Sequence, residues 1–161
     1  MRKGQTATEY LIILAVVIVI ALIVVGVLGG IPGIGSSGQS KASAAYWSTL
    51  DPIAVSSFSN SVANGVAVVV RNNGKNAYTL SEFRLGTAGV GPAAVYSTDT
   101  ALAIGAEAKL ETLPAALPAN IVCATMGEGF TYDVEIEYTD QTTSATYVFK
   151  GTQKLEGSCA Q

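Results

Sequence analysis

The sequence of 161 residues has no histidine, so the side chain that most often serves as a general base or a metal ligand is missing. Only 13% of the residues are charged, and nine Lys and Arg against twelve Asp and Glu give a formal net charge of −3. This acidic balance argues against nucleic acid as a partner. No Asn-x-Ser/Thr triplet is present, so N-linked glycan at that acceptor is not expected.

Groupings of residues that support catalysis are also lacking. We find no nucleophile beside a base, no set of metal ligands and no phosphate loop. The segment 33–38 fits the pattern G-x-G-x-x-G, but a dinucleotide site needs a short strand before it and a βαβ unit around it. An apolar run predicted to be helical precedes it instead. We therefore expect neither an enzyme nor a cofactor.

The sequence is rich in apolar residues, and one long run of them lies near the N-terminus. Between Tyr10 and Leu28 no side chain is charged, and the only polar group is the Tyr10 hydroxyl. As a helix, these ~19 residues would extend roughly 28 Å, close to the ~30 Å hydrocarbon core of a bilayer. Arg2 and Lys3 precede the run and no basic cluster follows it, which predicts a membrane helix with its N-terminus in the cytoplasm.

Glu9 lies at the start of this run, where a carboxylate costs a few kcal/mol. A cut between Gly4 and Gln5 would create an α-ammonium one helical turn before Glu9. In a bundle of such helices, the ammonium of one subunit could neutralise Glu9 of its neighbour. Two plainer interpretations stand beside this one. They are a cleaved secretory signal, although the run exceeds the usual ~7–15 residues, and a permanent single-pass anchor.

The N-terminal motif resembles the class III signal peptide of archaeal type IV pilins, in the archaellin and pilin superfamily. The resemblance rests on the apolar run and on the residues before it, Lys3-Gly4-Gln5-x-x-x-Glu9-Tyr10. It covers about 30 residues closely. Ala7 stands where the usual motif of the family has Ser.

This resemblance implies a membrane aspartyl prepilin peptidase that cuts between Gly4 and Gln5, with Arg2 and Lys3 upstream of the cut. It also implies that the apolar segment is kept and forms the core of a helical filament. Gln5, Glu9 and Tyr10 would then be assembly residues.

A glycine-rich break follows the apolar run. Pro32 lies within residues 29–35 and predicts a kink. Ser36-x-x-Gln39 has the pattern of a capping box and predicts a second helix over 37–50, which Asp51-Pro52 ends. We expect Trp47 or Tyr46 of this helix to pack against the part of the chain that follows.

From Ile53 onward, short β-prone runs alternate with turn signals, which is typical of an antiparallel sandwich. The expected strands and connections are a strand over 66–71, a tight turn over 72–75, strands over 78–81 and 83–85 with a bulge near Glu82, a loop over 86–100, weak strands over 102–104 and 108–111, the clearest strand over 132–138, a turn over 139–142 and a return strand over 146–150. These runs would supply about seven or eight strands.

Three carboxylates line one face of the clearest strand, Asp133, Glu135 and Glu137, while its tyrosines and aliphatic residues line the other face. The expected role of the three is the solvated face of an edge hairpin, where like charges discourage aggregation. A Ca²⁺ site completed by Asp140 and a contact between subunits are the alternatives.

Cys123 and Cys159 are the only cysteines, so one intrachain pairing exists. Both lie in the part expected outside the cell, where disulfides persist. A bridge would hold the C-terminal tail and add roughly 3–4 kcal/mol of stability on the chain-entropy estimate. Two separate thiols are the alternative.

The expected fold class is α+β, a long N-terminal hydrophobic helix followed by an antiparallel Ig-like β-sandwich head. The segments are a cleaved leader (1–4), a hydrophobic filament-core or transmembrane helix (5–30), a kink and short connecting helix (31–52) and the β-sandwich head domain (53–161).

The expected function is that of a structural subunit of an archaeal type IV pilus-like surface filament, with its head exposed for adhesion or surface contact. Its expected partners are its own copies, the prepilin peptidase with the assembly machinery, and the cytoplasmic membrane before assembly. The alternatives are a single-pass membrane-anchored extracellular binding module that does not polymerise, and an archaellin or minor pilin.

Overall fold

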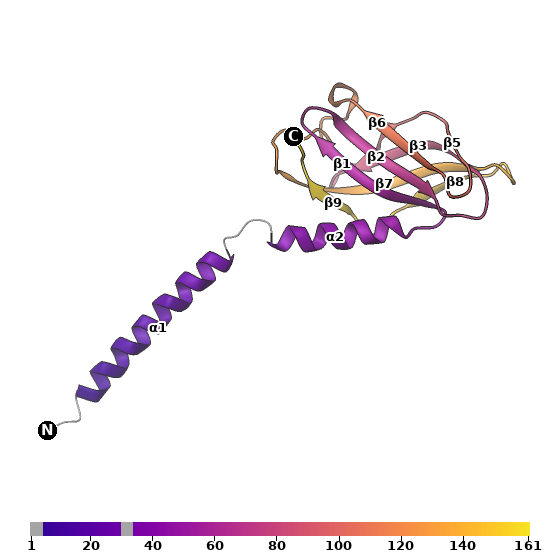
Figure 1. The fold of residues 1–161 in the computed structure, drawn as a ribbon. Coiled ribbons are helices and arrows are strands. Elements are labelled where there is room, and N and C mark those ends of the chain that lie inside the picture. The colour runs from indigo at the N-terminus through magenta and orange to yellow at the C-terminus, as the bar shows by residue number, and fades with distance from the viewer. Residues whose placement is uncertain (1–4, 30–33) are drawn as a thin grey trace. The chain divides into compact units, whose positions relative to one another are not determined.

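The computed structural model describes the backbone of residues 5–29 and 34–161 and the side chains of 9–23 and 39–161. The chain divides into two compact units, Met1–Gly35 and Ser36–Gln161. We call the second of these the head unit. The elements are α1 (Gln5–Gly29), α2 (Ile34–Ser48), β1 (Ile53–Ser61), β2 (Gly65–Asn72), β3 (Tyr78–Gly86), β4 (Ala93–Tyr96), β5 (Thr100–Leu102), β6 (Glu107–Thr112), the 3₁₀ helix η1 (Pro114–Ala116), β7 (Gly129–Asp140), β8 (Thr146–Lys150) and β9 (Leu155–Ser158) (Figure 1).

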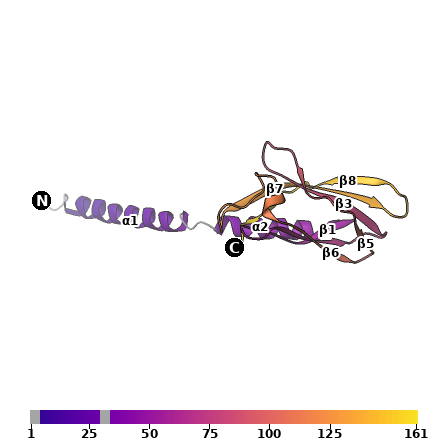
Figure 2. The same cartoon turned by 90° about the horizontal axis from the view of Figure 1, so that it is seen from above.

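The strands of the head unit form two antiparallel groups that face each other. The first sheet has the order β1-β2-β6, and the second has the order β4-β3-β7-β8, with β5 paired to β3 and β9 paired to β7. Figure 2 shows the two layers, with α2 lying in the layer of β1 and β6. Their inward side chains form one apolar core, whose fully buried members include Trp47, Val68, Val70, Leu80, Phe83, Leu85, Leu102, Leu110, Ile121 and Ile136.

The predicted fold class, α+β with a long N-terminal hydrophobic helix, is wrong. The part of the chain described with side chains is mostly β-sheet, with 44% of its residues in strands, and the helices are described in this way only over 9–23 and 39–48. Among the described residues no helix is both long and apolar enough to cross a membrane. The prediction gave the run from Tyr10 to Leu28 equal weight in naming the class, whereas most of the elements that follow it are strands. The two sheets themselves are sandwich-like.

The tight turn predicted over 72–75 does not join two strands of one sheet. β2 pairs with β1 and β6, and β3 pairs with β7, so the turn over 72–75 passes from one sheet to the other. Asn72 shapes this crossing, because its buried amide nitrogen donates to the carbonyls of Asn76 and Leu102 at 2.8 and 2.9 Å. The bulge expected near Glu82 is present as a register shift between Leu80 and Glu82, opposite β7.

Two further predicted boundaries differ from the structure. The predicted loop over 86–100 contains β4 and reaches the first residue of β5, both short strands on β3. The second helix begins at Ile34 and ends at Ser48, so Ser36 lies inside it and does not precede it as a cap. The expected kink at Pro32 lies outside the described residues.

Candidate functional site

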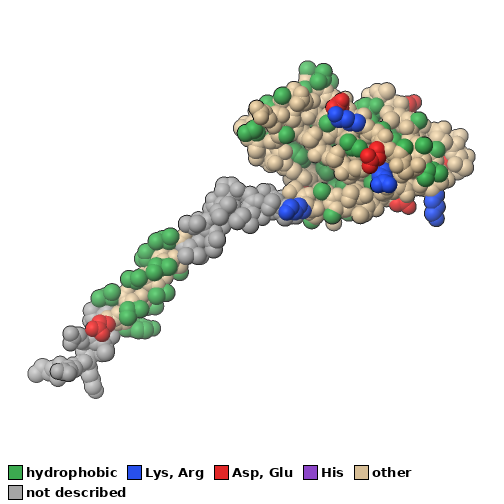
Figure 3. Space-filling model, viewed as in Figure 1, with side chains coloured by type: hydrophobic (Ala, Val, Ile, Leu, Met, Phe, Trp, Pro, Cys, Tyr) green, Lys and Arg blue, Asp and Glu red, His purple; other side chains and the backbone are tan. Residues whose placement is uncertain are grey.

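The described part of α1 carries large apolar side chains on all its sides. Twelve of them are between 42% and 66% exposed, and we call them the α1 apolar surface: Tyr10, Leu11, Ile12, Ile13, Leu14, Val16, Val17, Ile18, Val19, Ile20, Leu22 and Ile23. Consecutive residues of a helix point in directions about 100° apart, so this run covers the whole circumference. Figure 3 shows hydrophobic side chains along α1, whereas on the head unit they are scattered among other atoms.

The residues predicted for processing and assembly lie at the N-terminal end of α1. Gln5 is the first residue of the helix, and Glu9 follows four positions later, where a helix places a residue on the same side. Glu9 and Tyr10 are exposed. The predicted cut beside Gly4, with Arg2 and Lys3 before it, lies outside the described residues.

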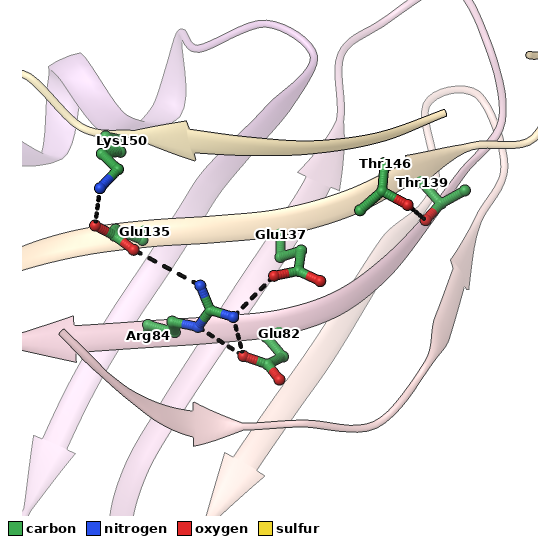
Figure 4. A network of polar contacts seen from close by, with 7 residues as sticks. All are labelled: Glu82, Arg84, Glu135, Glu137, Thr139, Thr146 and Lys150. Carbon is green, nitrogen blue, oxygen red and sulfur yellow. Dashed lines mark hydrogen bonds and ion pairs between the residues drawn. The ribbon is translucent and has the colours of Figure 1, made fainter. Parts of the chain in front are cut away.

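The outer face of the second sheet holds a network of charged side chains centred on Arg84 of β3 (Figure 4). The Arg84 guanidinium contacts Glu82 and Glu137 through Nη2 at 2.6 and 2.8 Å, and Glu135 through Nη1 at 3.7 Å. Lys150 of β8 approaches Glu135 from the other side at 2.7 Å. The hydrogen bond and the charge of Glu82 raise the pKa of Arg84, against the opposing effect of desolvation.

The carboxylate stripe of β7 lies on the outer face of the β7–β8 hairpin, and β8 is the edge strand of the sheet, but the carboxylates are paired with cations and do not face solvent alone. β7 is an internal strand between β3 and β8, and its register places Arg84 directly opposite Glu135. Asp133 in turn pairs with Lys154 at 3.2 Å. Alternation along one strand shows which residues share a face, but the cations come from neighbouring strands that alternation does not reveal.

Asp140 is separate from this network and does not complete a cation site with it. Its carboxylate accepts a hydrogen bond from Asn76 Nδ2 at 2.8 Å and from the backbone N–H groups of Thr142 and Thr143 at 2.7 and 3.3 Å. The residue is 7% exposed and holds the turn between β7 and β8. Within the described parts of the chain, no three His, Cys, Asp or Glu side chains gather closely enough to hold a metal ion.

We expect Asp140→Ala to destabilise the head unit by an amount that depends on pH. The hydrogen bond from Asn76 lowers the pKa of Asp140 below its ordinary value. The folded state thus binds the proton less readily than the unfolded state. The carboxylate's contribution is full above about pH 4 and is lost as pH falls through the lowered pKa.

Urea unfolding of wild type and variant between pH 2 and 7 measures this effect. The difference in unfolding free energy should be constant near neutral pH and should shrink below about pH 4. The exposed Asp99, replaced by alanine, serves as the control and should give a small difference at every pH. A difference for Asp140→Ala that does not change with pH would contradict this assignment.

The predicted disulfide between Cys123 and Cys159 is confirmed, with the two Cα atoms 5.8 Å apart. Cys159 follows β9 directly, and its backbone is also bonded. Its N–H donates to the Glu128 carbonyl at 2.7 Å, and its carbonyl accepts from the Gly127 N–H at 2.9 Å. The bridge thus holds the C-terminal end of the chain against the segment before β7.

Sequence reasoning missed the role of Arg84. A usable signal was present, because Glu82 and Arg84 lie two residues apart in a strand and so share a face.

The prediction that Trp47 or Tyr46 packs against the part of the chain that follows is confirmed, since Trp47 is fully buried in the core.

Comparison with protein-family models, with curated proteins and with solved structures finds no match.

Proposed function

We propose that this chain is a structural subunit of an archaeal type IV pilus-like filament on the cell surface. In this proposal copies join through α1, and the head unit is exposed for adhesion or surface contact. The observation that carries the proposal is the α1 apolar surface. Among its described residues, the first compact unit contains α1 and only the first two residues of α2, and one helix cannot bury its own side chains.

The all-round distribution of these side chains favours a polymer over a dimer. A helix that pairs with one partner needs an apolar stripe of about two residues in every seven. Here apolar residues point in all directions, so outside a membrane several neighbouring helices are needed to remove them from water. When every neighbour is another copy, contacts between different faces repeat from subunit to subunit and build a filament.

Glu9 would form an ion pair between neighbouring copies in the proposed assembly. Cleavage between Gly4 and Gln5 by a prepilin peptidase would leave an ammonium on Gln5, one turn from Glu9. Stacked neighbours would then bring the ammonium of one copy to the carboxylate of the next. In an apolar filament core such a pair is needed, because either charge alone would be buried without compensation. The assembly machinery that selects these subunits would be the other partner.

We expect Glu9→Ala to abolish filaments while the head unit still folds. The change leaves the ammonium of each neighbour buried and unpaired, which costs about 3–5 kcal/mol per contact. Electron microscopy of the sheared surface fraction should show a loss of filaments of well over tenfold. Circular dichroism and the intact disulfide would show that the head unit is folded.

Glu111→Ala is the matched control, because it removes one carboxylate from the head unit. The Glu111 side chain is 63% exposed and pairs only at the surface with Lys109. Filaments should form normally in this variant. Normal filaments in Glu9→Ala would contradict the pairing of Glu9 and would favour a chain that does not assemble through this contact.

A further inference from the structure

Within the head unit, helix α2 is held to the strands by a segment more than a hundred residues further along the chain. Ser43 Oγ donates to the Lys154 carbonyl at 2.9 Å and accepts from the Glu156 N–H at 3.1 Å. The Tyr46 hydroxyl accepts from the Thr152 N–H at 3.1 Å. Ser43 therefore bonds the backbone of Lys154, which directly precedes β9, and of Glu156, which lies within it.

Trp47 forms the apolar part of the same contact. Its indole is 0% exposed and meets the Phe149 ring edge to face, with centroids 6.4 Å apart. It also lies directly on the backbone at Gly151, because a Cβ atom there would come within 2.1 Å of Trp47 Cη2. Only a glycine leaves room for the indole at this place. We call residues 149–156 the clamp.

The strand that ends the clamp is short, and the clamp is held besides by the Gly151 N–H, which donates to the Val134 carbonyl at 3.0 Å, and by the pair of Lys154 with Asp133. β9 pairs with β7 through four residues, from Leu155 to Ser158. Residues 151–154 before it belong to no strand. Directly after β9, the disulfide ties Cys159 to Cys123. The covalent bridge thus closes the end of the segment that holds α2.

We propose that the Cys123–Cys159 disulfide is the lock of this clamp, so that breaking it releases α2 and Trp47 while the two sheets remain folded. The biological role of such a lock rests on the proposed function, because only a filament would place the chain under tension. In the chain, α2 lies between α1 and the strands, so tension between a filament core and a head unit would pass through α2. Asn73 Nδ2, which donates to the Leu50 carbonyl at 3.0 Å, is a second and non-covalent hold near the end of α2.

The single tryptophan makes the lock measurable, because all indole fluorescence reports on Trp47. We would measure acrylamide quenching of the full chain in detergent, for wild type and for the double variant Cys123→Ser with Cys159→Ser. The quenching constant should rise about threefold or more in the variant, as for a locally opened site. The far-UV circular dichroism of the strands should stay unchanged.

Leu110→Ala is the matched control for a general loss of stability. Leu110 is a core residue of β6, 2% exposed, in the sheet opposite the one that carries β8 and β9. This variant should lower the urea midpoint without changing the quenching constant in the absence of urea. An equal rise in quenching for Leu110→Ala would overturn the proposal, as would no rise in the double variant.

Reduction of the folded wild type gives the same test without a substitution. A phosphine reduces the S–S bond and is itself oxidised to the phosphine oxide, with the oxygen of one water molecule. The two protons of that water go to the two sulfurs, which become thiols. Quenching should rise before the circular dichroism of the sheets changes. Simultaneous loss of both signals would overturn the proposal. Because these measurements use unassembled chains, failure to form filaments would count against the proposed function and not against the lock.

Discussion

Replacement of Trp47 by alanine is expected to lower the free energy of unfolding of the head unit by about 3–5 kcal/mol. The indole is fully buried, contacts Tyr46 and Phe149 edge to face, and fills the space over Gly151. Alanine would remove these contacts and leave a cavity between α2 and the second sheet. Urea unfolding followed by circular dichroism measures the loss.

Tyr147→Ala is the control for removing an aromatic ring. Tyr147 also stacks on another ring, that of Tyr138, but its side chain is 47% exposed. Its removal should cost less than about 1.5 kcal/mol. Equal losses for the two variants would contradict the view that α2 is part of the core. A loss below about 1 kcal/mol for Trp47→Ala would contradict it equally.

Replacement of Gly65 by alanine is expected to cost about 2–4 kcal/mol, for two separate reasons. Gly65 has φ of +72°, which a residue with a Cβ atom rarely adopts. An added Cβ would also lie 2.2 Å from the carbonyl oxygen of Thr112. Because that oxygen belongs to the backbone of β6, the first sheet itself would have to shift.

Gly105→Ala separates the two reasons. Gly105 has φ of +73°, nearly the same conformation, but no atom lies within 4 Å of the added Cβ. Its replacement should cost only about 1 kcal/mol of backbone strain. The difference between the two variants then measures the steric contact with β6. Thermal or urea unfolding that gives equal losses would show that the close approach of Gly65 to Thr112 is not rigid.

The strands with clear alternation were predictable from the sequence, but their neighbours were not. Tyr132, Val134 and Ile136 of β7 are buried as their two-residue spacing indicates. The same spacing could not show that β7 is internal, because that depends on β3, which lies about fifty residues earlier. For the same reason the carboxylates of β7 were assigned to solvent, whereas Arg84 lies among them.

Other features were hidden because their local signals are weak or misleading. β4 consists largely of alanine and valine and follows a glycine-containing segment, so its composition does not distinguish it from a loop. Residues 72–75 have the composition of a tight hairpin turn, yet the chain crosses there from one sheet to the other. The buried Asn72 side chain stabilises this crossing through its hydrogen bonds to the carbonyls of Asn76 and Leu102. The pairing of Cys123 with Cys159 was predictable because two cysteines allow only one bridge.

The N-terminal sequence of the mature surface protein tests the proposed filament subunit most directly. We expect Gln5 to be the first residue, since only removal of residues 1–4 creates the ammonium proposed to pair with Glu9. Edman sequencing or mass spectrometry of protein sheared from the cell surface gives the answer in one measurement. Met1 as the first residue, or a start beyond Gly30, would contradict the account.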